Sequence, residues 1–228
     1  WIALKNKLYD LGIDLVSKES SSLRSPDLEI HLNVWKMNNG KWPKFAILTE
    51  TDFIHPDNSN INQLKKYDHL FSWNPILVDI GLATKIQFSH PMGKGIVNGF
   101  EKRDKFAVLF GSNRSLRGWY PKNDLYRERV KTIRWFERNA PNDFFLYGRK
   151  WDLSGRLPTR FGALVHSLEK KLPFNYCPFP SWKGVILNKQ NVLINSRFSI
   201  VYENVRGLKG YITEKIFDAF TAGNIPIY

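Results

Sequence analysis

The sequence predicts an α/β protein in which helices cover parallel sheets. Three observations support this fold class: short continuous apolar runs, helical patterns between them, and polar or glycine-containing turns at their ends. The clearest runs lie at 45–49 (FAILT), 70–73 (LFSW), 106–110 (FAVLF) and 144–147 (FFLY). Continuous rather than alternating apolar residues are typical of parallel strands that are buried on both faces.

Two such units are expected, divided near residue 100. The chain has 228 residues, 43% of them hydrophobic, which is enough for two modest domains. The glycine-containing segment 93–99 and the charged run 101–105 form the best candidate for a linker. We therefore expect an N-terminal domain over 1–100 and a C-terminal domain over 101–228. Because the chain stops at Tyr228 within an apolar run, the second domain is expected to be incomplete.

The first domain supplies one candidate catalytic group. Glu50 directly follows the apolar run 45–49, and Asp52 lies two residues further on. A carboxylate at the end of a strand can reach the edge of a cleft, where it can act as a general base. A solvated loop residue is the alternative interpretation of the same pattern.

A helix is expected between the third and fourth runs, over about 123–139. On a helical wheel, Leu125, Ile133 and Phe136 form an apolar face, and Arg129 lies in the middle of it. An unpaired buried charge costs several kcal/mol, so Arg129 requires an anionic partner. That partner is either a carboxylate of the protein or a phosphate of a ligand.

The stretch 198–228 is the most informative part of the chain. It predicts an apolar strand over 198–202, a glycine-containing loop, a short helix after Thr213 and a second apolar strand. Thr213 can serve as the N-cap, and Gly223 follows the last turn, as glycine often does at helix C-termini. The apolar residues of this helix are expected to dock it on the sheet; they are Ile216, Phe217 and Phe220.

Polar residues gather where this helix begins and where the preceding strand ends. Free N–H groups and the helix dipole make a helix start an anion site, and Lys215 adds a cation. In open α/β sheets, ligands bind at the carboxyl ends of strands. The sequence therefore predicts an anion site here, with an ordinary capped helix and a solvated Glu–Lys pair as the alternative. The candidate residues are Glu203, Asn204, Tyr211, Thr213, Glu214 and Lys215.

The composition narrows the range of partners. A formal charge of +13 at pH 7 favours phosphates, nucleic acid or an acidic membrane surface. The basic residues are spread along the chain, which argues against a nucleic-acid-binding arm. The single cysteine, Cys177, cannot form a disulfide within the chain and is expected to be a small buried side chain. No apolar run in the sequence approaches the ~20 residues that cross a bilayer.

The sequence lacks the common motifs of nucleotide-binding loops and metal sites. The chain has no G-x-x-x-x-G-K-[ST] loop, no G-x-G-x-x-G after a strand and no Asp-x-Asp pair. Its five histidines show no metal-ligand spacing, so no metal site is expected. A diphosphate bound without a metal would require protein cations, and Lys215 with Arg129 would suit that role.

The order of residues in 198–228 resembles the donor-binding signature of the α-1,3-fucosyltransferases, glycosyltransferase family 10. That signature runs from an apolar strand through F-E-N, a glycine-containing loop, Y-[VI]-T-E-K and a helix to I-P-[IV]. This chain has YENV at 202–205 and YITEK at 211–215. Tyr202 stands in place of the usual Phe, and Val205 stands where Ser or Thr is common.

Weaker similarity extends over most of 45–150. Glu50 falls at the end of a strand that closes on Glu in the family. Arg129 falls on the arginine that contacts the donor phosphate, with Arg127 as the alternative register. The region 153–195 shows no similarity of this kind.

The resemblance implies a GT-B fold, with two Rossmann-like domains facing a central cleft. The implied reaction transfers fucose, with inversion, from GDP-β-L-fucose to a hydroxyl of a GlcNAc- or Gal-type glycan, in an α-1,3 linkage. Glu50 would be the base, Arg129 and Lys215 would neutralise the diphosphate, and no metal or cofactor would be needed. The remaining donor-binding candidates are Glu203, Asn204, Tyr211, Thr213 and Glu214, of which the last would hold the ribose hydroxyls.

Three alternatives stay open: a transferase for another GDP-sugar, a catalytically dead relative that still binds GDP, and a basic nucleic-acid-binding module. The expected partners are a GDP-sugar and an oligosaccharide or glycolipid acceptor, with peripheral contact to an anionic membrane and no nucleic acid. The chemistry and the single cysteine favour a bacterial cytoplasmic enzyme at the inner membrane face. The Golgi lumen is the alternative location, for a trimmed eukaryotic fragment.

Overall fold

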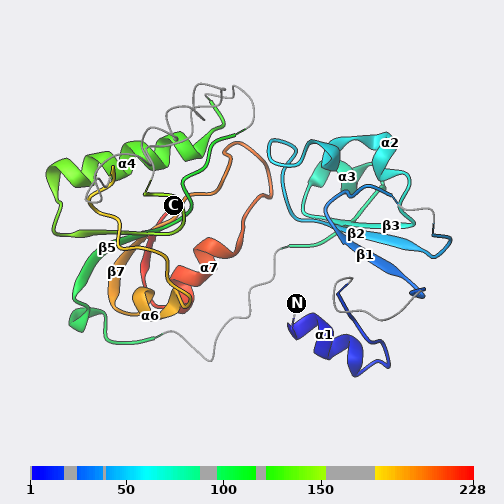
Figure 1. The fold of residues 1–228 in the computed structure, drawn as a ribbon, viewed down its shortest axis with the longest axis horizontal. Helices are drawn as coiled ribbons and strands as arrows, with labels where there is room; N and C mark the ends of the chain where they lie inside the picture. The colour runs from blue at the N-terminus through cyan, green and yellow to red at the C-terminus, as the bar shows by residue number, and fades with distance from the viewer. Residues whose placement is uncertain (1, 18–24, 38–39, 88–96, 117–121, 153–177) are drawn as a thin grey trace.

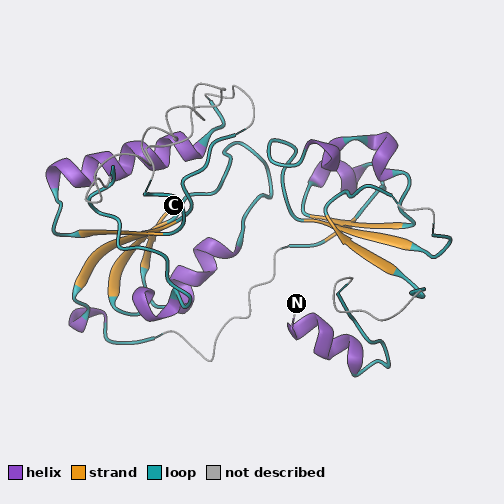
Figure 2. Cartoon of the chain, viewed as in Figure 1, coloured by secondary structure: helices purple, strands orange, loops and turns teal. Residues whose placement is uncertain are grey.

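The chain forms two four-stranded parallel sheets, which confirms the expected α/β class (Figures 1 and 2). The structure is a computed structural model, and it describes residues 2–17, 25–37, 40–87, 97–116, 122–152 and 178–228. The linker candidate 93–99 lies largely outside these residues, as does Cys177.

The first sheet has the strand order β1-β2-β3-β4, so each strand lies beside its predecessor in the chain. Its strands are β1 (Glu29–Leu32), β2 (Lys44–Leu48), β3 (His69–Ser72) and β4 (Thr84–Lys85). The connections contain the short helices η1 (Pro56–Ser59), α2 (Ile61–Leu64) and α3 (Pro75–Asp79). Ala46, Leu48, Leu64, Leu70 and Leu77 are buried together and form most of this core. The first helix, α1 (Ile2–Tyr9), buries none of its residues.

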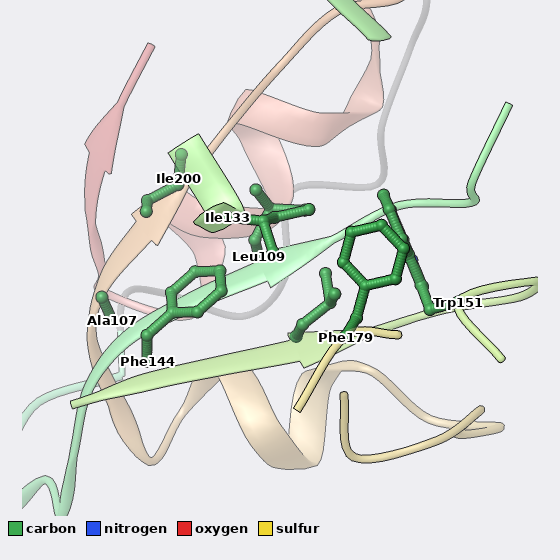
Figure 3. Packing of buried hydrophobic residues seen from close by; sticks show 8 residues of the cluster. Ala107, Leu109, Ile133, Phe144, Trp151, Phe179 and Ile200 are labelled. Carbon is green, nitrogen blue, oxygen red and sulfur yellow. The ribbon is translucent and has the colours of Figure 1, made fainter. Parts of the chain in front are cut away.

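The second sheet has the order β6-β5-β7-β8. Its strands are β5 (Lys105–Phe110), β6 (Phe144–Tyr147), β7 (Ser196–Ile200) and β8 (Ile225–Ile227). Its helices are η2 (Phe100–Lys102), α4 (Leu125–Asn139), α6 (Gln190–Leu193) and α7 (Glu214–Thr221). In the core, Ile133 of α4 packs among Leu109, Phe144 and Ile200 of the sheet (Figure 3). Figure 3 also shows Trp151 and Phe179 extending this core beyond the strand ends.

The predicted elements agree with the structure where the hydrophobic signal is strong. The strands expected at 45–49, 70–73 and 106–110 are present within a residue of their bounds, and the one at 144–147 is exact. β7 begins two residues earlier than expected. β1 and β4 were not predicted, because β1 mixes polar and apolar residues and β4 is an exposed two-residue edge strand.

One packing expectation, for α7, is wrong. The apolar residues Ile216, Phe217 and Phe220 were expected to dock this helix on the sheet. The helix instead buries Asp218 and Ala219, while Phe220 is 43% exposed. Asp218 forms an ion pair with Lys189, which compensates the burial of its charge, and the small side chain of Ala219 needs little space.

The first sheet lies before residue 100 in the chain and the second sheet lies after it. The division into two domains near residue 100 stays a prediction. The loop between β7 and α7 reaches toward the first sheet and the helices that cover it (Figure 1). The rings of Tyr211 in this loop and Trp73 after β3 lie 4.8 Å apart. Phe53 and Ile54 of the first lobe also pack on a small apolar cluster of the second. Within the part of the chain that the structure describes, no helix is long and apolar enough to cross a membrane.

Candidate functional site

A cavity of about 380 Å³ lies at the carboxyl ends of β5 and β7. We call it the β5–β7 cavity. The chain leaves β5 toward β6 on one side and later adds β7 on the other, so the strand order reverses here. Ligands of open α/β sheets bind at such a reversal. Its wall also includes Thr49 and Glu50, which follow β2 in the first lobe.

Arg129 provides a buried cation at this cavity. The side chain is only 3% exposed, although it belongs to α4, whose apolar face packs on the sheet. Its Nη1 donates to the carbonyl of Ser112 at 3.2 Å, and its Nη2 donates to the carbonyl of Tyr202 at 3.4 Å. Burial lowers the pKa of the guanidinium from its usual value. Its other described contact is the ring of Tyr126, whose centroid lies 5.0 Å from Cζ, and the carboxylates of Glu203 and Asp124 act on the charge from beyond ion-pair distance.

No described carboxylate forms a salt bridge with Arg129, and its buried Nε has no hydrogen-bond partner among the described residues. The sequence left two partners open, a carboxylate of the protein or a ligand phosphate. The described part of the chain supplies no such carboxylate at ion-pair distance. Arg127, the alternative to Arg129 in the comparison with the family pattern, is exposed and does not line the cavity.

Gly111 allows Arg129 to approach the end of β5. A Cβ at this position would lie 2.7 Å from Nη1 and 3.1 Å from Cζ of the guanidinium. Real Cβ atoms are essentially never that close to another heavy atom, so a larger residue would displace Arg129. The absence of a side chain at Gly111 therefore leaves room for the guanidinium of Arg129.

The start of α7 supplies the second cation, Lys215. Its Nζ donates to Oε2 of Glu203 at 3.1 Å and to Oγ1 of Thr213 at 2.7 Å. Glu203 is 4% exposed, and it also accepts from the backbone N–H of Thr213 at 2.8 Å and from its hydroxyl at 2.7 Å. Thr213 is the N-cap residue, as expected, but its own side chain makes no capping hydrogen bond. The Glu203 carboxylate thus ties the end of β7 to the start of α7 and positions Lys215.

Glu50, which follows β2, lines the same cavity as these cations. Its Oε2 is buried and has no hydrogen-bond partner among the described residues. Burial raises the pKa of the Glu50 carboxyl above its ordinary value of 4.5, although the positive charges of Lys215 and Arg114 act in the opposite direction. A carboxylate with a raised pKa and a free oxygen is suited to accept a proton.

Two asparagines fix the backbone at Glu50. The Oδ1 of Asn33 accepts from the N–H of Glu50 and from Nδ2 of Asn58, both at 2.8 Å. The same Asn58 amide donates to the carbonyl of Glu50 at 2.8 Å. Asn33 has a φ of 63°, a left-handed conformation that asparagine adopts more readily than most residues. Sequence reasoning missed both residues, because β1, which Asn33 directly follows, was itself not predicted.

The other predicted residues fall on or beside the same cavity. Tyr211 is 5% exposed, and Asn204 donates to its hydroxyl at 3.4 Å. Burial raises the pKa of the Tyr211 phenol well above its usual range. Glu214 lines the cavity with its carboxylate 3.8 Å from Nζ of Lys215. Glu203 does not line the cavity and acts through Thr213 and Lys215.

The structure therefore brings the three predicted catalytic residues, Glu50, Arg129 and Lys215, to one cavity from two lobes. It adds cavity residues that the sequence did not single out: Ser112, Arg114, Lys189 and Asp218. No group of three or more His, Cys, Asp or Glu residues in the described ranges could hold a metal ion.

A scan against models of known protein families found no match, and a search of curated protein sequences found none. Cations at the strand-reversal point can bind a diphosphate, and the carboxylate that lines the same cavity can remove a proton from an attacking group.

Proposed function

We propose that this chain is an inverting glycosyltransferase that moves L-fucose from GDP-β-L-fucose to a hydroxyl of a GlcNAc- or Gal-type glycan, in an α-1,3 linkage. The observation that carries the proposal is the meeting of Arg129, Lys215 and Glu50 at the β5–β7 cavity. An inverting transfer requires this pair of functions: charge stabilisation on the leaving side and a base on the acceptor side. The choice of fucose comes from the resemblance of 198–228 to family 10.

On the leaving side, the bond between the anomeric carbon and the β-phosphate oxygen breaks, and its electron pair stays with GDP. Negative charge therefore grows on the diphosphate, so cations fixed nearby stabilise the transition state more than the bound substrate. Arg129 is fixed by burial and by its two carbonyl contacts. Lys215 is held at the helix start by Glu203 and Thr213, and a phosphate would compete for its ammonium group.

On the acceptor side, a glycan hydroxyl forms the new bond to the anomeric carbon and gives its proton to Glu50. The transition state is oxocarbenium-like, as in glycoside hydrolysis. The raised pKa of Glu50 makes its carboxylate a stronger base than that of an exposed glutamate. The step requires Glu50 in its ionised form, because only the carboxylate can accept the proton. No step requires a metal ion.

The remaining donor contacts follow from the same cavity. Glu214, next to Lys215 in the first turn of α7, would accept from the ribose hydroxyls, and Tyr211 with Asn204 would line the donor pocket. We also propose peripheral contact with an anionic membrane at the cytoplasmic face, because the chain carries a formal charge of +13.

Thermal stability with ligands tests the proposal. GDP is expected to raise the melting temperature more than UDP or a single-stranded oligonucleotide, since ligands stabilise the folded state that binds them. Stabilisation by the oligonucleotide but not by GDP would favour a nucleic-acid-binding module instead. In the Lys215→Ala variant, the donor KM is expected to rise and kcat to fall. Unchanged kinetics in this variant would remove the phosphate role of Lys215.

A further inference from the structure

The helix α4 carries a basic stripe on its exposed side. Arg127, Lys131, Trp135 and Arg138 follow one another at steps of three or four residues, so they lie along one face of the helix. All four residues are exposed, and Trp135 is 53% exposed. The opposite face of α4 packs Ile133 into the core of the second sheet (Figure 3). We call the stripe the outer face of α4.

Two further cations lie at the N-terminal end of this face. Lys122 and Arg206 are both exposed, and the backbone N–H of Arg206 donates to the carbonyl of Asn123, just before the helix. Tyr126, in the first turn of α4, lines the β5–β7 cavity. The basic face therefore begins beside the proposed donor site and runs away from it along the helix.

Accessible carboxylates compensate little of this charge. Glu128 pairs with Lys131 at 2.8 Å, and Asp143 is exposed in the turn that follows α4. The side chain of Glu137 is only 8% exposed and pairs with Arg134 at 2.7 Å, so this pair adds no net charge to the surface. The exposed cations of the outer face and its N-terminal end thus outnumber the accessible carboxylates of α4 and the next turn by five to two. Such an excess attracts an anionic partner.

The single tryptophan favours a lipid surface over a nucleic acid as that partner. An indole ring combines an apolar body with a polar N–H, and tryptophan is therefore enriched at the headgroup level of membranes. Lys and Arg residues around such a ring bind anionic headgroups. Single-stranded nucleic acids are instead held in grooves where several aromatic rings stack on successive bases. The outer face of α4 is the convex side of one helix, and Trp135 is its one aromatic residue.

We propose that the outer face of α4 docks the protein on an anionic lipid bilayer, with Trp135 in the headgroup layer and the cations around it on the lipid headgroups. The inference rests on the proposed function and deepens it, because it assigns the membrane contact to one surface. Since α4 also supplies Arg129 to the β5–β7 cavity, docking holds this cavity about one helix diameter, ~10–12 Å, from the bilayer surface. A glycolipid acceptor in the same bilayer is then presented close to the proposed donor site.

The test is a vesicle flotation assay with two lipid compositions: phosphatidylcholine alone, and phosphatidylcholine with about 30% phosphatidylglycerol. The protein is expected to float with the anionic vesicles only, and to bind them more weakly in about 0.5 M salt than in about 0.1 M salt. The triple variant Arg127→Gln/Lys131→Gln/Arg138→Gln is expected to lower the partition coefficient about 100-fold, because each cation near an anionic surface contributes about fivefold.

A second triple variant separates a docking surface from the effect of net charge. Lys36→Gln/Lys65→Gln/Lys66→Gln removes the same number of charges from exposed lysines of the first lobe. The partition coefficient is expected to fall by no more than about threefold in this control, because these lysines lie away from the docked face and act only through the screened field.

Two exposed tryptophans form a second matched pair. Trp135→Ala is expected to weaken binding to the anionic vesicles about 5- to 10-fold, because the ring no longer enters the headgroup layer. Trp35, which is 65% exposed in the first lobe, provides the control, and Trp35→Ala is expected to change the partition coefficient by less than about twofold. This pair decides the question by itself if the basic triple variant does not fold.

Equal losses in the two triple variants, or in the two tryptophan variants, would overturn the docking surface, as would equal binding to neutral and anionic vesicles or no binding to either. Binding of a single-stranded oligonucleotide through the same residues, without vesicle binding, would replace the membrane by a nucleic acid. A GDP titration separates these results from the proposed function, since none of the substituted residues lines the β5–β7 cavity. GDP binding without vesicle binding through α4 overturns only the docking surface, whereas vesicle binding through α4 without GDP binding overturns the proposed donor.

Discussion

Gly111→Ala tests whether Arg129 acts on the donor phosphates. The new Cβ would lie 2.7 Å from Nη1, and the guanidinium would have to retreat by about 0.7 Å to reach ordinary contact distance. Gly111 does not have a left-handed φ, so alanine fits the backbone, and the expected effect comes from the displaced guanidinium. The hydrogen bonds of Arg129 to Ser112 and Tyr202 are already 3.2 and 3.4 Å long and would not survive such a shift.

The expected loss is one charge-assisted hydrogen bond to a phosphate, about 1.5–3 kcal/mol, or about 10- to 150-fold in the Kd for GDP. The assay is calorimetric titration of GDP into Gly111→Ala, Arg129→Ala and the double variant. Because the alanine acts through the guanidinium, it is expected to change the Kd by no more than about twofold once Arg129 is absent. An equal loss in both backgrounds, or no loss in the single variant, would refute the reasoning.

Further outcomes concern the base and its support. Glu50→Gln is expected to keep GDP binding and to lower transfer by about 10²- to 10⁴-fold, and an active variant would contradict the base assignment. The folded chain holds the Glu50 proton to a higher pH than the unfolded chain, so stability falls as pH rises from 4.5 through the raised pKa. Glu50→Gln should therefore have the larger free energy of unfolding at pH 7 and no advantage below pH 4.5, by denaturant titration; a variant less stable at pH 7 would oppose this. Asn33→Gly keeps the left-handed backbone and removes the amide that holds Glu50; it should lower kcat and leave the Kd for GDP unchanged, and an unchanged kcat would remove the positioning role.

The strongest local patterns predicted the fold well. Continuous apolar runs at 45–49, 106–110 and 144–147 correspond to β2, β5 and β6, because buried parallel strands require such runs. The helical wheel placed Arg129 on the buried face of α4, and the structure buries it. These features depend on residues near each other in the sequence.

Features that depend on distant residues could not be predicted in this way. The face that α7 buries is decided partly by Lys189, which neutralises Asp218 from another element. The support of Glu50 by Asn33 and Asn58 joins the residues after β1 and β2 to η1, and no local pattern indicates it. A cavity of about 430 Å³ at the carboxyl ends of β2 and β3 likewise requires residues 207–209 to approach these strands.

The most direct test of the central claim is a product analysis. The full chain is incubated with GDP-β-L-fucose and a neutral GlcNAc- or Gal-terminated acceptor, and the anomeric configuration of the product is read by NMR. The proposal predicts one α-fucoside for each GDP released, because a base opposite a fixed diphosphate site inverts the anomeric carbon. A β-fucoside, or release of GDP without a fucosylated product, would contradict it.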